Sequence, residues 1–409
     1  MEMIDGGVTA AGGFSAAGCK AGVKYPDRLD MAMIYSKKPC VAAGVFTGNI
    51  VKAAPVIWDR RIIRQKHGYV HAVVVNTGIA NAGTGEEGAK HCLETAEKTA
   101  SVLGIDKDEV LLGSTGVIGP QLNMPAILSG IDKLKAGLSE SREASHEASL
   151  AIMTTDTHPK ECAVRFDAGG KQVTLGGMAK GSGMIHPNMG TMLVYLTTDL
   201  SISGEMLQKA LSEVVPDTFN MISVDGDTST NDTLVVLANG EAGNSEITAE
   251  DADYDTFRKA LFLVTENLSR QLAGDGEGAT KLITCKVINA SDKAKAKILA
   301  KSVITSNLTK AALYGNDANW GRILCAMGYS GAQFDPDRLD LYFDAGGCKR
   351  IHVYHDGAGL AFSEDEATAL LKHEEVIITA DIKEGDACAT AWGCDLTHEY
   401  VNINADYRS

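Results

Sequence analysis

The stretch KGSGMIHPNMGTMLVYLTTD, from Lys180 to Asp199, joins a polar, glycine-rich loop directly to a run typical of a buried strand. Gly190 and Thr191 stand at the join. A threonine hydroxyl is a weak nucleophile without a base. Cleavage of the peptide bond before it would supply one, because the new α-amino group has a pKa of about 7.7–8.0. Glycine most easily adopts the backbone that attack on its own carbonyl requires. A plain glycine turn entering a strand is the ordinary reading of this dipeptide taken alone, and self-cleavage with Thr191 as nucleophile is the hypothesis that the other loops bear on.

Composition narrows the class of protein. The chain has 409 residues with 44% hydrophobic and 22% charged residues, which indicates a globular protein of two to three domains or one large two-part fold. It contains neither an apolar run long enough to span a membrane nor a secretory signal pattern, so we expect a cytoplasmic protein. A formal net charge of −15 disfavours nucleic acid and anionic membranes as partners.

The nine cysteines contain no CxxC pair and no accompanying histidine cluster. Reduced thiols are the expected state, and neither a metal site nor a cofactor is predicted. The glycine loops raise a nucleotide-binding module as a further hypothesis, but the GxxxxGK[ST] pattern is absent and no ribose-binding acid stands at a useful spacing.

Helical and strand patterns are interleaved along the chain without strict alternation, which favours an α+β fold of layered sheets with flanking helices. Amphipathic spacing predicts helices at 86–104, 124–140, 254–274 and 293–315. Short β-branched runs predict strands at 71–76, 109–114, 192–198, 233–238, 281–288, 339–343, 375–382 and 387–393.

Three further loops carry candidate chemistry. GSTGVIG (113–119) follows a strand and places Thr115 and Gly116 where a hydroxyl and an amide could stabilise an oxyanion, although a tight turn is an equal reading. In GDGEGATK (274–281) the carboxylate of Glu277 would repel phosphate and suit a substrate ammonium group. MTTDTHPK (153–160) is either a hydroxyl-rich pocket wall or the edge of a strand.

Taken together, these loops resemble the ornithine acetyltransferase family, also called bifunctional glutamate N-acetyltransferase, of arginine biosynthesis. The resemblance covers essentially the whole chain, in family order. Its seven blocks are AAGVFTGNIVKAAPV (42–56), VVNTGIANAGTG (74–85), GSTGVIG (113–119), AIMTTDTHPK (151–160), KGSGMIHPNMGTML (180–193), GEGATK (276–281) and YGNDANWGRI (314–323).

The resemblance implies a precursor cut between Gly190 and Thr191 into an α chain of residues 1–190 and a β chain of residues 191–409. The acetyl group of N-acetylornithine would pass to glutamate through an acetyl-threonine at Thr191, in a ping-pong cycle. Thr115 and Gly116 resemble the oxyanion pair. The implied substrate contacts are Thr157, with Thr154 and Thr155 as alternatives, together with Lys180, Thr191, Glu277, Asn404 and Ser409.

The family pattern also leaves alternatives open. The family more often has alanine at the positions of His186 and Gly190; we expect the new amine rather than His186 to act as the base. An autocleaved threonine amidohydrolase or aminopeptidase, which hands the acyl group to water, is the competing function. The resemblance implies an α2β2 assembly, and acetyl-CoA as an additional acetyl donor stays open.

Overall fold

The computed structural model describes residues 1–64, 69–186 and 192–406, whose contacts form two compact units. Unit 1 comprises Met1–Gly181, Asn188–Pro216 and Asp227–Leu268, and unit 2 comprises Ser182–Pro187, Asp217–Gly226 and Ser269–Ser409. Both predicted chains therefore supply residues to both units. Gly190, Thr191 and Ser409 lie outside the described residues, so cleavage into residues 1–190 and 191–409 stays a prediction.

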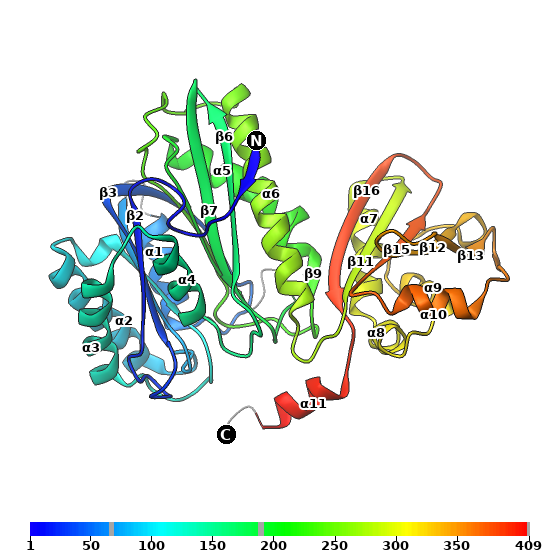
Figure 1. Cartoon of the computed structure of the whole chain (residues 1–409), viewed down its shortest axis with the longest axis horizontal. Coiled ribbons are helices and arrows are strands. Elements are labelled where there is room, and N and C mark those ends of the chain that lie inside the picture. The colour runs from blue at the N-terminus through cyan, green and yellow to red at the C-terminus, as the bar shows by residue number, and fades with distance from the viewer. Residues whose placement is uncertain (65–68, 187–191, 407–409) are drawn as a thin grey trace. The chain divides into compact units, whose positions relative to one another are not determined.

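Unit 1 is built on a nine-stranded mixed sheet with the order β1-β6-β7-β8-β10-β3-β4-β5 and with β2 paired to β3. Figure 1 shows β6 and β7 of this sheet side by side. The β8–β10 and β4–β5 pairs are parallel, and the others are antiparallel. Its strands are β1 (Glu2–Ile4), β2 (Phe14–Cys19), β3 (Met31–Phe46), β4 (Tyr69–Asn76), β5 (Val110–Ser114), β6 (Lys160–Ala168), β7 (Lys171–Lys180), β8 (Leu193–Thr198) and β10 (Thr233–Ala238).

Helices cover this sheet with their apolar sides. Every residue of β8 and β10 is buried, as expected of strands covered on both faces. α2 ends at Gly104, whose φ of 73° is the left-handed conformation that glycine adopts without strain. The helices are α1 (Ala54–Arg64), α2 (Gly85–Leu103), α3 (Met124–Gly137), α4 (Arg142–Ala151), α5 (Gly204–Val214) and α6 (Ala252–Gly274), the last of which belongs to unit 1 up to Leu268.

The two predicted chains share this sheet. β7, which precedes the predicted cleavage point, pairs with β8, which follows it, from Leu175↔Thr198 to Lys180↔Leu193. β3 likewise pairs with β10 along six residue pairs. Because ladders of backbone hydrogen bonds connect the two parts, we expect them to stay associated after the connecting bond is cut.

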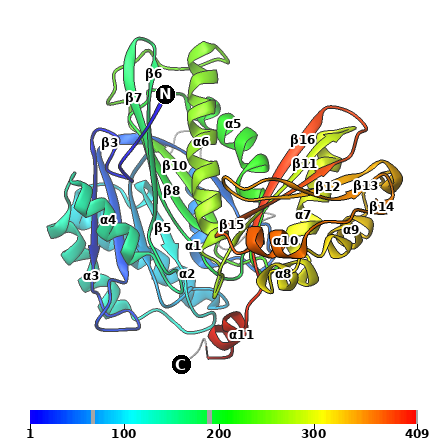
Figure 2. The ribbon, with the colours of Figure 1, turned by 45° about the vertical axis from the view of Figure 1, so that its right-hand side comes forward.

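Unit 2 contains a second sheet with the order β14-β13-β12-β15-β11-β16-β9. α7 packs against β11 and β16, with α8 and α9 beside it, and α10 contacts β12 (Figure 2). The elements are β9 (Ile222–Ser223), β11 (Leu282–Ala290), α7 (Lys293–Thr305), α8 (Asn307–Tyr314), α9 (Trp320–Gly328), β12 (Asp340–Asp344), β13 (Ile351–His355), β14 (Ala358–Gly359), α10 (Glu364–Leu371), β15 (Glu375–Asp381), β16 (Ala387–Cys394) and α11 (His398–Ala405).

The expected α+β class with layered sheets and flanking helices is confirmed. The single helix expected at 293–315 is wrong, because Ser306 ends α7 with an extended backbone and caps α8 by accepting the Thr309 amide. Among the described residues, no helix is both long and apolar enough to cross a membrane.

Candidate active site

The expected oxyanion loop lies directly after β5. Gly116 has a φ of +129°, and a Cβ added to it would approach the carbonyl carbon of Gly78 to 2.3 Å. Only glycine fits this position without backbone movement. The Thr115 amide donates to the Asn76 carbonyl oxygen at 3.1 Å, which fixes the loop at the edge of the sheet.

Two hydrogen-bond donors of this loop are available to a ligand. Within the part of the chain that the structure describes, no protein atom accepts a hydrogen bond from the Thr115 hydroxyl or from the Gly116 amide. Thr115 is 5% exposed, so its hydroxyl is held in a largely dehydrated setting where a hydrogen bond to a developing negative charge is strengthened. The loop therefore has the donors that an oxyanion hole requires.

Asn231 connects the oxyanion loop to the segment before β10. Its side-chain amide donates to the Ser114 carbonyl oxygen at 2.7 Å and to the Ala80 carbonyl oxygen at 2.6 Å. The Ser114 hydroxyl in turn donates to the Asn76 side chain at 2.6 Å. These buried bonds fix the positions of Ser114 and Asn231 relative to each other, and no sequence motif pointed to a role for either residue.

The next residue, Asp232, fixes the start of β8. Its Oδ1 atom accepts the Met192 amide at 3.0 Å, and the Met192 carbonyl oxygen accepts the Thr233 amide at 3.0 Å. Met192 directly follows Thr191 in the chain. The segment 231–232 thus bonds both to the oxyanion loop and to the residue after the predicted nucleophile.

Lys180 ends β7 and is buried, with 3% of its surface exposed. Its Nζ atom lies 3.9 Å from Asp156 Oδ2, while Lys160 Nζ and the Gly181 amide both bond to Asp156 Oδ1 at 2.7 Å. Burial alone would raise the pKa of Asp156, but the Lys180 and Lys160 ammonium groups and a backbone amide hold that pKa well below its ordinary value.

Asp156 is thus a charged carboxylate that faces the Lys180 side chain. The sequence pattern 153–160 showed this aspartate beside the threonines but gave it no role. Thr157, the preferred contact among them, is exposed, and its hydroxyl lies 3.1 Å from His158 Nδ1. Thr154 and Thr155 are half-buried. Nothing in this geometry separates the three threonines as substrate contacts.

In unit 2, Glu277 and Asn404 lie in contact, and their role as substrate contacts stays a prediction. The Asn404 side-chain amide donates to Glu277 Oε2 at 2.7 Å, and the Glu277 amide donates to the Ser182 carbonyl oxygen at 2.9 Å. A Cβ on Gly183 would lie 2.3 Å from the Glu277 carboxylate, so that glycine leaves room for the acid. Glu277 is 6% exposed.

The start of the terminal helix α11 is attached to the same loop. The Thr397 hydroxyl donates to the Gly278 carbonyl oxygen at 2.8 Å and also accepts the Tyr400 amide as the helix cap. Gly278 has a φ of +69°, and a Cβ there would approach the Tyr400 amide nitrogen to 2.8 Å. These contacts explain why the tail presents Asn404 to Glu277.

His186 is bound within unit 2. Its Nδ1 atom lies 3.0 Å from the Ser223 hydroxyl, and the preceding Ile185 amide donates to Asp225 Oδ1 at 2.9 Å. These contacts give the ring a structural partner, consistent with the expectation that it is not the base.

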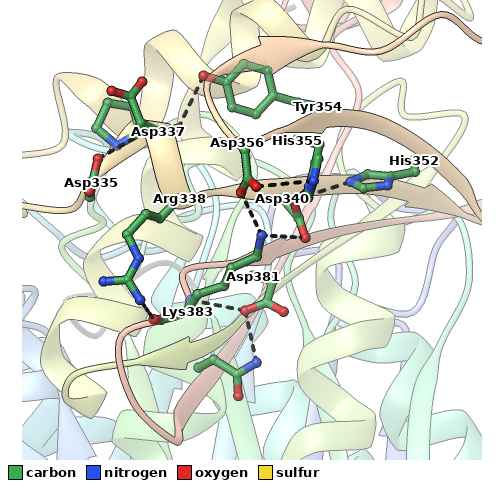
Figure 3. Close-up of polar contacts among 12 residues, drawn as sticks. Asp335, Asp337, Arg338, Asp340, His352, Tyr354, His355, Asp356, Asp381 and Lys383 are labelled. Carbon is green, nitrogen blue, oxygen red and sulfur yellow. Dashed lines mark hydrogen bonds and ion pairs between the residues drawn. The ribbon is translucent and has the colours of Figure 1, made fainter.

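A separate polar cluster on the second sheet was not found from the sequence. Asp340 Oδ1 lies 2.6 Å from His355 Nδ1 and 3.5 Å from His352 Nε2, and Figure 3 shows the three side chains converging. Such donors can bind a divalent cation. However, Lys383 Nζ lies 2.9 Å from Asp340 Oδ2 and 3.0 Å from Asp356 Oδ1, and Figure 3 shows it between the two carboxylates. The lysine already supplies the positive charge, so we describe the cluster as an ion-pair network.

Comparison with known proteins identifies the chain. A family model described as the ArgJ family matches residues 15–409. "Arginine biosynthesis bifunctional protein ArgJ 1" of Clostridium acetobutylicum is 50% identical over 97% of this chain and 96% of its own length. "Arginine biosynthesis bifunctional protein ArgJ" of Symbiobacterium thermophilum is 49% identical over 100% of both chains.

Two solved structures are similar to part of this chain. The crystal structure of an ArgJ bifunctional protein from Bacillus halodurans is 47% identical, with a TM-score of 0.49, and covers 52% of this chain and 97% of its own. The ornithine acetyltransferase of Mycobacterium tuberculosis, solved with ornithine, is 38% identical, with a TM-score of 0.42, and covers 46% and 97%.

The class of protein follows from these full-length matches: the chain is an enzyme of arginine biosynthesis. In particular, it belongs to the ArgJ family. The resemblance drawn from the seven sequence blocks is thereby confirmed.

Proposed function

We propose that this chain moves the acetyl group of N2-acetylornithine to glutamate through an acetyl ester on Thr191. The observation that supports the proposal most directly is the segment 231–232. It bonds to Ser114, which immediately precedes two available donors, and to Met192, which immediately follows the proposed nucleophile. A nucleophile beside a preorganised pair of donors suits acyl transfer.

The precursor would first cut itself between Gly190 and Thr191. The Thr191 hydroxyl oxygen attacks the Gly190 carbonyl carbon, its proton passes to the Thr191 nitrogen as the peptide C–N bond breaks, and water hydrolyses the resulting ester and restores the hydroxyl. The products are a carboxylate on Gly190 and a free amine on Thr191. The α chain 1–190 and the β chain 191–409 remain associated through the shared sheet, and we propose that two such pairs form α2β2.

In the transfer cycle, the Thr191 amine takes the proton of the Thr191 hydroxyl as its oxygen attacks the acetyl carbon. The Thr115 hydroxyl and Gly116 amide stabilise the oxyanion. The ammonium then returns the proton to the departing ornithine nitrogen as the C–N bond breaks. Glutamate reverses these steps when its amine attacks the acetyl ester. The atoms and protons of the cycle therefore balance without a metal or a cofactor.

The remaining site residues would bind the charged ends of the substrates. Lys180, which faces the charged Asp156, pairs with a carboxylate, and Glu277 pairs with the ornithine ammonium. Asn404, Thr157 and Ser409 complete the proposed contacts. The product supplies amino-acid biosynthesis, and we propose that the enzyme acts in the cytoplasm.

The proposed function is tested by incubating the purified chain with N-acetylornithine, with and without glutamate. We expect N-acetylglutamate and ornithine in equal amounts, with release of free acetate as a minor side reaction. Acetate release that does not depend on glutamate would instead favour an amidohydrolase. A parallel assay with acetyl-CoA and glutamate decides whether this chain also makes N-acetylglutamate from that donor.

Changing Glu277 to glutamine should weaken the binding of N-acetylornithine. Glutamine keeps an oxygen for the Asn404 amide but removes the charge, and a hydrogen bond to a charged group contributes about 1.5–3 kcal/mol. We therefore expect the KM for N-acetylornithine to rise about 10- to 100-fold, with a smaller change in kcat. Glu399→Gln, on α11 and bonded to Asn402, is the matched control. Equal effects of the two changes would contradict the role given to Glu277.

A further inference from the structure

One carboxyl oxygen of Asp232 accepts a hydrogen bond, and the other has no hydrogen-bond partner among the described residues. The residue is fully buried, with 0% of its surface exposed. Oδ1 accepts the Met192 amide at 3.0 Å, whereas Oδ2 is buried with no hydrogen-bond partner among the described residues. A buried carboxylate oxygen without a partner is costly, because folding removes its water and gives nothing in return.

The surroundings of Asp232 do not remove this cost. Burial raises the pKa of its carboxyl well above the ordinary value, and the Met192 amide, the Thr47 hydroxyl and the Lys180 charge only partly oppose the rise. The Thr47 hydroxyl donates its single proton to the Ser229 carbonyl oxygen at 2.6 Å. Lys180, at the end of β7, is the charged group that acts on this carboxyl, and its ammonium lies 3.9 Å from Asp156.

Covalent geometry brings a suitable partner within reach. Thr191 is bonded to Met192, and backbone bond lengths limit the distance between the two nitrogens to less than about 4 Å in any conformation. The Met192 nitrogen is itself bonded to Asp232 at 3.0 Å. Together these two limits keep the amine that cleavage would create on Thr191 within about 7 Å of Asp232 Oδ1.

We propose that Asp232 is a positioning residue for Thr191, in which Oδ1 fixes the Met192 amide and Oδ2 receives the α-amino group made by cleavage. This inference rests on the proposed function. When the amine accepts the hydroxyl proton, the O–H bond breaks, an N–H bond forms, and the carboxylate faces the resulting ammonium. Cleavage thereby supplies the missing partner of a buried acid.

The chain offers a closely matched control for this role. Asp59, on α1, is also 0% exposed, its Oδ1 accepts the Leu112 amide at 2.8 Å, and its Oδ2 has no partner among the described residues. Burial raises the pKa of this carboxyl in the same way. Asp59→Asn therefore reproduces the chemical change of Asp232→Asn at a carboxyl group that accepts the Leu112 amide instead of the Met192 amide.

The test compares Asp232→Asn, Asp59→Asn and the wild type by melting temperature, extent of cleavage and the pH dependence of kcat/KM. A facing carboxylate favours the ammonium form, so it raises the pKa of the amine and places the acid limb of the wild-type profile at higher pH. We expect Asp232→Asn to lower the plateau of kcat/KM and to move that limb down by about one pH unit or more. Asp59→Asn should leave the limb in place.

The outcomes separate the inference from the function on which it rests. A cleaved Asp232→Asn protein with an unmoved acid limb would overturn the inference while the wild type stays cut and active. Loss of cleavage at an unchanged melting temperature, with Asp59→Asn fully cut, supports it. If Asp232→Asn does not fold, Asp232→Glu, which keeps the charge but displaces it, replaces it: a lowered plateau of kcat/KM with Asp59→Glu unaffected supports the inference, and an unchanged plateau overturns it. An uncut or inactive wild type would contradict the proposed function instead.

Discussion

Thr191→Ala should leave a single chain of 43.2 kDa that neither cuts itself nor transfers acetyl groups. Alanine removes the hydroxyl that would attack the Gly190 carbonyl, and without cleavage no free amine exists to act as the base. Both steps depend on the same oxygen, so we expect them to be lost together. Intact-mass measurement and the acetylornithine–glutamate assay report the two losses independently.

Thr191→Ser is the matched control for this change, because serine keeps the hydroxyl and loses only a methyl group. We expect it to be cut and to retain measurable transfer.

The wild type should give two fragments under denaturing conditions, and the second should begin at Thr191. Under native conditions it should give one species, because the β7–β8 and β3–β10 ladders connect the two fragments. Acetyl transfer by intact Thr191→Ala would refute the mechanism.

Much of the fold could be predicted from local pattern. The amphipathic spacing of 86–104 and its terminal glycine predicted α2 and its end, and the β-branched run 233–238 predicted β10 to the residue. Prediction failed where a few polar residues interrupt a longer apolar pattern. The apolar periodicity of 293–315 continues through Ser306, but the serine side chain caps a new helix there. β3 was missed because SKKP interrupts its apolar run.

The residues of the candidate site were predicted or missed for a similar reason. Motifs such as GSTGVIG pointed to Thr115 and Gly116 because their loop chemistry is local. Asp156, Asn231 and Asp232 were overlooked, since each acts through contacts with residues far along the chain, such as the bond from Asn231 to Ser114. An aspartate that holds a buried lysine looks in the sequence like any loop acid. Only the sheet topology places these residues beside the motifs.

Thr115→Ala should lower kcat by about 10²- to 10³-fold, the usual effect of removing one oxyanion donor. The Thr115 hydroxyl has no acceptor among the described residues, so alanine breaks no existing side-chain bond, and the loop is still fixed by the bond from the Thr115 amide to Asn76. The missing donor is needed only when negative charge develops, so KM for both substrates should change little.

Steady-state kinetics of Thr115→Ala and Thr115→Ser, compared at equal extents of cleavage, test this role. Serine keeps the hydroxyl and should recover most of the lost rate, which a purely packing role for the threonine methyl group would not allow. Cleavage itself passes through an oxyanion on Gly190, so the alanine variant should also mature more slowly than the serine variant. A rise in KM at unchanged kcat would place Thr115 in substrate binding. An unchanged maturation rate beside a reduced kcat would mean that cleavage and transfer use different donors.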